Sequence, residues 1–286
     1  MMESNENYTK FDNDYLDFHQ VSDWAKDNKY IKSYYRKTNE NWKYYFRSIF
    51  KWHNETVNIW SHLLGFVGVL CSNIYININY DVGKYKSQDI CINIFTCCMM
   101  FCYLFSSIMH LFYPKNEQIC SKTQFLDYTG INILIASTFA TFIYYAFYCE
   151  RTIQIIYYSI ILSISIIILP ISKMKIFLMS KYRWIRPTVF TIYGSSFIVP
   201  IIHRITLIEE DDSIFNLELE YFVVAGIMYI IGIILYTTRF PENYWNGKFD
   251  LIGSSHQIFH IFVLLGGGIS LIGSIKSMDR ANNIVC

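Results

Sequence analysis

The sequence predicts an all-α fold: a polytopic membrane protein with seven transmembrane helices, its N-terminus cytosolic and its C-terminus outside. The composition indicates a membrane, since 53% of the 286 residues are hydrophobic and only 16% are charged. Apolar runs of roughly 20 residues, the length that a helix needs to cross the hydrocarbon core, recur along most of the chain. Seven such runs lie at about 57–78, 90–113, 126–148, 153–171, 185–203, 221–237 and 256–275. We expect no nucleic-acid partner.

The residues ahead of the first run divide into two parts. Residues 1–40 are polar, and we expect a flexible cytosolic N-terminal segment there. Residues 41–56 are expected to form an amphipathic helix that lies in the membrane interface or, alternatively, packs on the bundle. Its basic residues recur every four positions and its bulky apolar residues fill another face: Lys43, Arg47 and Lys51 against Trp42, Phe46, Ile49 and Phe50. The membrane domain then spans 57–276, and 277–286 form a short non-cytosolic tail.

The basic residues set the predicted orientation, because Lys and Arg are enriched in loops on the cytosolic side of a membrane. With the N-terminus cytosolic, 18 of the 24 Lys and Arg residues lie on the cytosolic side and 6 on the opposite side. The six are Lys84, Lys86, Arg151, Arg204, Lys276 and Arg280. The acidic loop 209–213 also falls on that opposite side. This orientation is the reverse of a rhodopsin-like receptor.

The first span opens with a polar stripe, Asn54, Asn58 and His62, spaced four residues apart. Residues at this spacing share one face of a helix. Because polar groups on spanning helices rarely face lipid, the stripe should face the interior of the bundle.

Three further histidines and a carboxylate lie at the same predicted depth. His256 and His260 open the seventh span, one helical turn apart. His110 closes the second span, which runs inward, and Asp127 opens the third. A lone histidine at a helix end is more often an interfacial side chain than a ligand. The convergence of these groups, each costly within a membrane, nevertheless predicts a metal site made by the three histidines.

Three neutral imidazoles with one open position describe a catalytic zinc site. Zinc lowers the pKa of a bound water toward about 7, and Asp127 is suited to act as the general base or to position that water. Ser106 lies one turn before His110 and could hydrogen-bond the water or a substrate carbonyl; its alternative role is that of a small residue easing helix packing. His62 stays open as a further ligand, whereas His203 lies at the opposite membrane surface.

Four segments resemble the signature motifs of the progestin and adipoQ receptor family, which includes adiponectin receptors and haemolysin III-like proteins. They read NETVNIWSHLLGF, SSIMHLFYP, LDYTGI and GKFDLIGSSHQIFHIFVL, and the similarity extends from about residue 50 to 276. The resemblance implies a seven-helix fold with zinc near the cytosolic surface. It places the family's S-x-x-x-H motif on Ser106 and His110, its aspartate on Asp127, and its H-x-x-x-H motif on His256 and His260.

The resemblance also implies a function, since members of the family are described as ceramidase-like hydrolases. We expect a zinc-dependent amide hydrolase acting on ceramide-like membrane lipids, in the plasma membrane or an endomembrane. The alternative is a receptor or lipid-state sensor in which the zinc is structural and a ligand binds from outside. A transporter is a third hypothesis, weakened because Asp127 is the sole in-membrane carboxylate near the site. The sequence identifies neither the lipid nor the oligomeric state.

Overall fold

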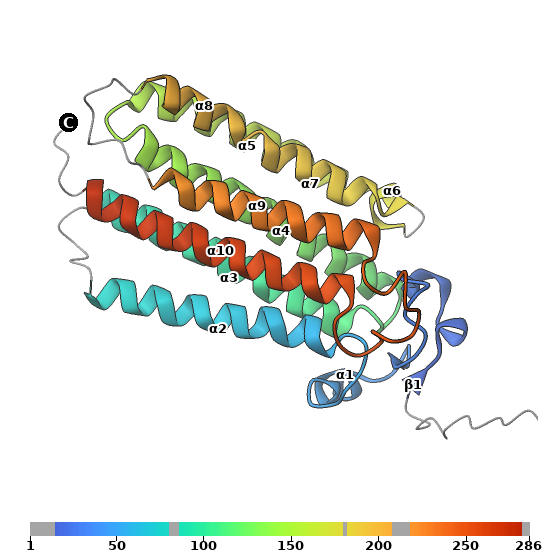
Figure 1. The fold of residues 1–286 in the computed structure, drawn as a ribbon. Coiled ribbons are helices and arrows are strands. Elements are labelled where there is room, and N and C mark those ends of the chain that lie inside the picture. Colours follow the sequence, from blue (N-terminus) through green and yellow to red (C-terminus); the bar gives the residue numbers. More distant parts are fainter. Residues whose placement is uncertain (1–14, 80–85, 180–181, 208–217, 282–286) are drawn as a thin grey trace, which may run out of the picture.

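The computed structural model describes residues 15–79, 86–179, 182–207 and 218–281, which form a bundle of long helices (Figure 1). Within these residues, seven helical spans are long and apolar enough to cross a membrane. They are Thr56–Asn79 (α2), Lys86–Phe112 (α3), Glu117–Ala146 (α4), Arg151–Ser172 (α5), Ile185–Thr206 (α7 and α8), Leu219–Thr238 (α9) and Ser255–Ala281 (α10). A short helix, Lys175–Leu178 (α6), follows α5. The predicted all-α fold with seven transmembrane helices is confirmed, whereas the orientation of its termini stays a prediction.

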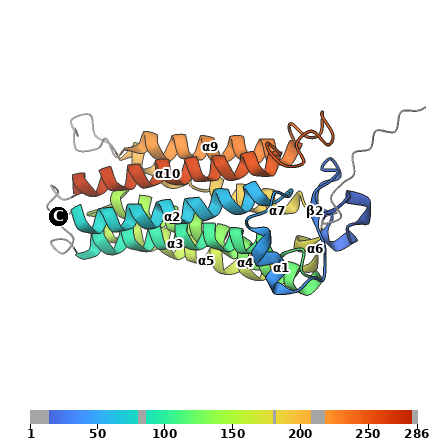
Figure 2. The same cartoon turned by 90° about the horizontal axis from the view of Figure 1, so that it is seen from below.

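α4 is the most buried of the spans. α3 and α5 pack along α4, α2 packs on α3, and α10 pairs with α9, as the two views of the bundle show (Figures 1 and 2). The outer faces of α2, α5 and α9 carry exposed Ile, Leu and Val side chains. Such surfaces are as apolar as lipid tails and are typical of helices that face a bilayer.

The fifth span was expected to be one helix over 185–203, but it is divided into α7 (Ile185–Ser195) and α8 (Ile198–Thr206). Pro200 explains the division, because it has no N–H to donate to the carbonyl of Ser196. That carbonyl accepts instead from the N–H of Val199 at 3.1 Å, which tightens the turn. The break places Phe197 between the two helices.

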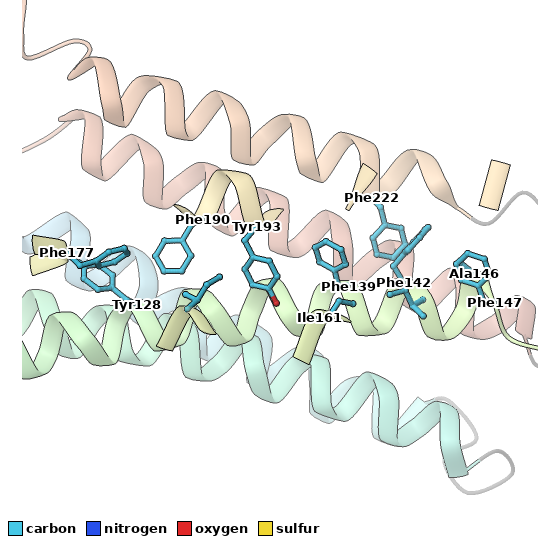
Figure 3. Close-up of a cluster of buried hydrophobic side chains, with 12 residues drawn as sticks. Tyr128, Phe139, Phe142, Ala146, Phe147, Ile161, Phe177, Phe190, Tyr193 and Phe222 are labelled. Carbon is cyan, nitrogen blue, oxygen red and sulfur yellow. The ribbon is translucent and has the colours of Figure 1, made fainter. Parts of the chain in front are cut away.

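An aromatic cluster joins α4 to α7 and α9 (Figure 3). Phe139 and Phe142 project from α4, and the ring of Phe139 lies edge-on to Phe197 with centroids 4.7 Å apart. Phe142 contacts Phe222 of α9 with centroids 5.2 Å apart. Aromatic pairs at these separations add stability beyond burial alone, so the cluster fixes α7 and α9 relative to the central helix.

Residues 15–54 pack against one end of the bundle, which we call the near end; the opposite end is the far end (Figure 1). Strands Tyr15–Leu16 (β1) and Tyr35–Arg36 (β2) pair antiparallel, with short 3₁₀ helices at Phe18–Gln20 (η1) and Asp23–Ala25 (η2) between them. A small core holds these elements together, made by Val21, Ala25, Ile31 and Tyr35. Residues 15–40 thus form a packed segment, whereas the expected flexibility of 1–40 stays a prediction; residues 1–14 lie outside the described part.

The helix expected over 41–56 is shorter, Trp42–Ser48 (α1). Asn41 caps it, because its side-chain oxygen accepts from the N–H of Tyr44 at 2.9 Å. Tyr45 is fully buried, and Phe46 packs on Phe112 at the end of α3 with ring centroids 5.2 Å apart, so the helix does pack on the bundle. Trp42, Phe46, Phe50 and Trp52 nevertheless keep large exposed surfaces beside basic residues. Contact with the membrane interface thus stays a prediction.

Candidate metal centre

Three imidazoles meet at the near end of the bundle. His110 lies in the last turn of α3, and His256 and His260 lie in the first two turns of α10. One ring nitrogen from each can be chosen so that all three lie within 4.8 Å of one another, close enough to hold one metal ion. His110 and His260 are buried and His256 is half-buried. The histidines singled out in the sequence are therefore brought together, from two helices.

The start of α10 is fixed by a buried carboxylate. Glu242, in the loop after α9, accepts a hydrogen bond from the backbone N–H of Ser255 at 2.8 Å and another from its hydroxyl. Gly253 adopts a φ of +86°, a left-handed conformation that favours glycine, and its N–H donates to the side chain of Gln257 at 2.6 Å. These contacts satisfy backbone donors at the helix start and set the position from which His256 and His260 project.

The hydrogen bonds of His110 and His260 use Nδ1 of each ring, so the other ring nitrogen can bind a metal. His110 donates from Nδ1 to Glu55 Oε2 at 2.7 Å, and its buried Nε2 has no hydrogen-bond partner in the described part of the chain. The Nδ1 of His260 lies 3.2 Å from the hydroxyl of Ser61, which itself donates to the carbonyl of Asn58 and so accepts from the ring. Metal-ligating histidines usually hold their second ring N–H in this way. The site therefore fits a metal ion.

Glu55 was not predicted to belong to the site. Burial by itself would raise its pKa, but hydrogen bonds from His110 and Asn58 lower the pKa to about 2, so the group is a carboxylate. The hydroxyl of Tyr113 also lies 3.4 Å from Glu55 Oε1. The sequence did give one indication that Glu55 belongs to the site: it lies one residue before α2, beside the polar stripe. An acidic residue at that position is, however, more simply explained as a favourable charge at the helix N-terminus.

Asp127 and Ser106 lie together beside the three histidines. Asp127 is 8% exposed on α4, and the Ser106 hydroxyl, on α3, is within hydrogen-bonding reach of its carboxyl group. Both residues line the same cavity as the histidines. Asp127 is not part of the group whose ligand atoms lie within 4.8 Å of one another. Asp127 is therefore a neighbour of the three histidines and not a member of that group.

His62, left open by the sequence, approaches the site without joining that group. Its ring stacks on His260 with centroids 3.7 Å apart and planes at 12°, and it is buried. Neither ring nitrogen has a partner among the described residues. The remaining histidines lie elsewhere: His203 contacts the hydroxyl of Tyr157 at 2.8 Å, and His53 contacts the carbonyl of Ser48 at 3.2 Å.

A cavity of about 500 Å³ extends from the histidines toward the middle of the bundle. On α4 its wall follows one face, with Asp127, Ile131, Leu134 and Thr138 at helical spacing. Its wall also includes side chains of α8 and α9 that are about half exposed on the outer surface, such as Ile198 and Ile227. The lining of the cavity thus extends to side chains of α8 and α9 that are exposed on the bundle.

The N-terminal segment covers the near-end mouth of this cavity. Asp27 accepts from Arg239 at 2.7 Å, and its second oxygen lies 3.8 Å from Arg186. Burial would raise the pKa of Asp27, but the two arginines lower it to about 2. Arg186 also donates to the hydroxyl of Tyr128 at 2.6 Å. The positive charges at the mouth are thus already paired.

The sequence is similar to known membrane proteins over most of its length. A sequence profile described as haemolysin III-related matches residues 50–269. The chain is 32% identical over 241 residues to the adiponectin receptor protein of Drosophila melanogaster, covering 84% of this chain and 54% of that protein. It is 31% identical over 280 residues to heptahelical transmembrane protein 1 of Arabidopsis thaliana, covering 95% of this chain and 83% of that protein. It is 30% identical over 263 residues to the ADIPOR-like receptor IZH2 of Saccharomyces cerevisiae, covering 91% and 83%. The chain thus spans about half the length of the Drosophila relative, with 54% covered.

Proposed function

The chain belongs to the haemolysin III-related family, and from that premise we propose that this multi-pass membrane protein is a zinc-dependent hydrolase that cleaves the amide bond of ceramide-like lipids. One observation carries the proposal: the cavity whose lining extends to exposed side chains of α8 and α9 ends at three imidazoles with a carboxylate beside them. A membrane lipid with an amide bond could enter that cavity from the side without leaving the bilayer.

Zinc is the metal that the donor set favours. His110, His256 and His260 would hold it through neutral imidazole nitrogens, and three histidines with an open position are typical of catalytic zinc. When bound, zinc supplies a Lewis acid that polarises a carbonyl and makes water acidic near neutral pH. Glu55 supports this role by keeping a proton on Nδ1 of His110, so that Nε2 presents its lone pair to the ion.

Other residues of the chain would transfer the proton, position the carboxyl group and bind the acyl chain. Asp127 takes the proton of the attacking water on its carboxylate and can return it to the leaving amine, as general acid–base catalysis requires. Ser106 holds the Asp127 carboxyl in place through its hydroxyl. The apolar wall on α4 accommodates the acyl chain, and the N-terminal segment limits access of bulk water from the near end.

A receptor or lipid-state sensor is the second candidate, favoured by the names of the relatives from Drosophila and yeast, both called receptors. In that case the metal would be structural and would tie the end of α3 to the start of α10. An outside ligand would then bind near the far end.

The test is hydrolysis by the purified protein in nanodiscs. A panel of ceramides is incubated with the metal-loaded protein, with protein stripped by a chelator, and with stripped protein resupplied with zinc; released fatty acid is quantified. We expect release only in the two zinc-containing samples. No zinc-dependent release from any ceramide would reject the hydrolase and leave the receptor or sensor.

A further inference from the structure

The wall of the cavity formed by α2 carries three polar side chains whose role is not explained by the metal. Asn54, at the entry to α2, and Asn58 and His62 on the helix follow one another at four-residue spacing and all line the cavity. Their exposed fractions are 8%, 3% and 4%. Each keeps a buried side-chain atom with no hydrogen-bond partner among the described residues: Oδ1 of both asparagines and both ring nitrogens of His62.

Glu55 fixes which way the two asparagine amides point. The Nδ2 of Asn58 donates to Glu55 Oε2 at 2.6 Å, and the Nδ2 of Asn54 lies 3.4 Å from Glu55 Oε1. A carboxylate can only accept hydrogen bonds, so each amide must turn its NH₂ group toward Glu55. The two carbonyl oxygens are therefore the unpaired groups. Of the unpaired groups on this wall, the two asparagine oxygens are acceptors, whereas the neutral ring of His62 adds one acceptor nitrogen and one N–H donor.

Buried acceptors without a donor are rare in proteins because the lost hydration is not replaced. A ligand that pairs them must bring O–H or N–H groups. A carboxylate or a phosphate diester offers only acceptors and would not pair them. The arginines at the cavity mouth, which could attract an anion, are already paired with Asp27.

We propose that Asn54, Asn58 and His62 form a head-group subsite for a neutral lipid, in which the asparagine oxygens accept hydrogen bonds from its hydroxyl and amide N–H groups and the ring of His62 pairs with a hydroxyl, which can both donate and accept. The inference rests on the proposed function, because it assigns the polar end of the substrate to the wall next to the metal site. It adds a requirement: a lipid must carry hydrogen-bond donors beside its amide to bind well. A lipid lacking those hydroxyls, or a free fatty acid, fits the same apolar cavity but leaves the acceptors unpaired.

The test compares binding of a fluorescent short-chain ceramide with binding of its 1-deoxy analogue, which lacks one hydroxyl, to metal-loaded protein in nanodiscs. We expect the wild type to bind the ceramide about three- to tenfold more tightly, the effect of one hydrogen bond. Asn58→Leu and, separately, Asn54→Leu should reduce this preference by weakening ceramide binding alone. The matched control is Asn73→Leu, because Asn73 lies on the same helix but bonds Asn93 and Thr96 at 2.7 and 2.8 Å, away from the cavity.

Metal content and thermal stability are measured on every variant, so that loss of fold or of zinc is not mistaken for loss of the subsite. An unchanged preference in both Leu variants that keep their metal would overturn the subsite. The same loss in Asn73→Leu would overturn it as well. Released fatty acid is quantified in the same samples. Its absence would reject the hydrolase, while the binding preference would still decide the subsite.

Discussion

Replacing Glu55 should weaken metal binding although Glu55 is not a ligand. Its carboxylate accepts from His110 Nδ1 at 2.7 Å, and the two side chains are only 15% and 3% exposed, so solvent screens the contact little. A hydrogen bond to a charged group contributes about 1.5–3 kcal/mol net and one between neutral groups about 0.5–1.5 kcal/mol. Glu55→Gln keeps a neutral acceptor, so we expect a loss of about 1–1.5 kcal/mol, or roughly five- to tenfold in affinity.

Glu55→Leu removes the acceptor altogether and should cost more, about 10–100-fold, as is common for the hydrogen-bond partners of metal-ligating histidines. The assay is competition between the purified protein in detergent and a chelator of known zinc affinity. The matched control is Asp250→Asn. Asp250 is also a buried near-end carboxylate, but it accepts from Ser33 at 2.7 Å and not from a histidine. Wild-type affinity in Glu55→Leu would refute the role of Glu55, and an equal loss in Asp250→Asn would show that the effect is general destabilisation.

Three further predictions concern the ligands, the orientation and the packing. Alanine at His110, His256 or His260 should each lower bound zinc in metal analysis, and His62→Ala should lower it much less; equal loss in His62→Ala would contradict the ligand set. A protease-cleavable tag before Met1 should resist protease on intact cells and be cut after the plasma membrane is permeabilised, because the near end is expected to face the cytosol. The disulfide-bonded Cys149, which follows α4 at the far end, fits an oxidising compartment on that side. Cleavage on intact cells would contradict the predicted cytosolic N-terminus. Gly267→Ala should destabilise the protein by about 1–3 kcal/mol, because a Cβ there would overlap the Tyr103 hydroxyl, whereas Gly268→Ala, with nothing within 4 Å, should be neutral or stabilising in thermal unfolding.

The spans and the three histidines could be predicted because one-dimensional patterns determine them. Apolar runs of about 20 residues specify membrane helices, and the alternating direction of successive spans places His110 at the same depth as His256 and His260. Depth together with helical spacing is enough to predict that side chains on different helices meet. The central part of the site therefore follows from the sequence alone.

The parts that were missed depend on contacts between distant segments of the chain. Asn28 donates to Glu242 at 3.0 Å, and Ser33 bonds Asp250, both across more than 200 residues. These bonds, with a small apolar core, fold the N-terminal segment onto the bundle, and no local pattern predicts them. Glu55 was missed for the same reason, since its partner His110 lies on another helix. The break between α7 and α8, in contrast, could have been predicted from the sequence, because Pro200 disfavours a continuous helix.

The proposal that zinc and Asp127 together hydrolyse a lipid amide is tested most directly by measuring metal content and ceramide hydrolysis on the same samples of wild type and Asp127→Asn. Asparagine keeps the size of the side chain but cannot take a proton from water. We expect Asp127→Asn to retain a full complement of zinc and to lose about 10²–10⁴-fold in rate, the usual contribution of a general base. Equal rates in the two proteins would remove Asp127 from the chemistry, and no zinc-dependent release by the wild type would contradict the hydrolase itself.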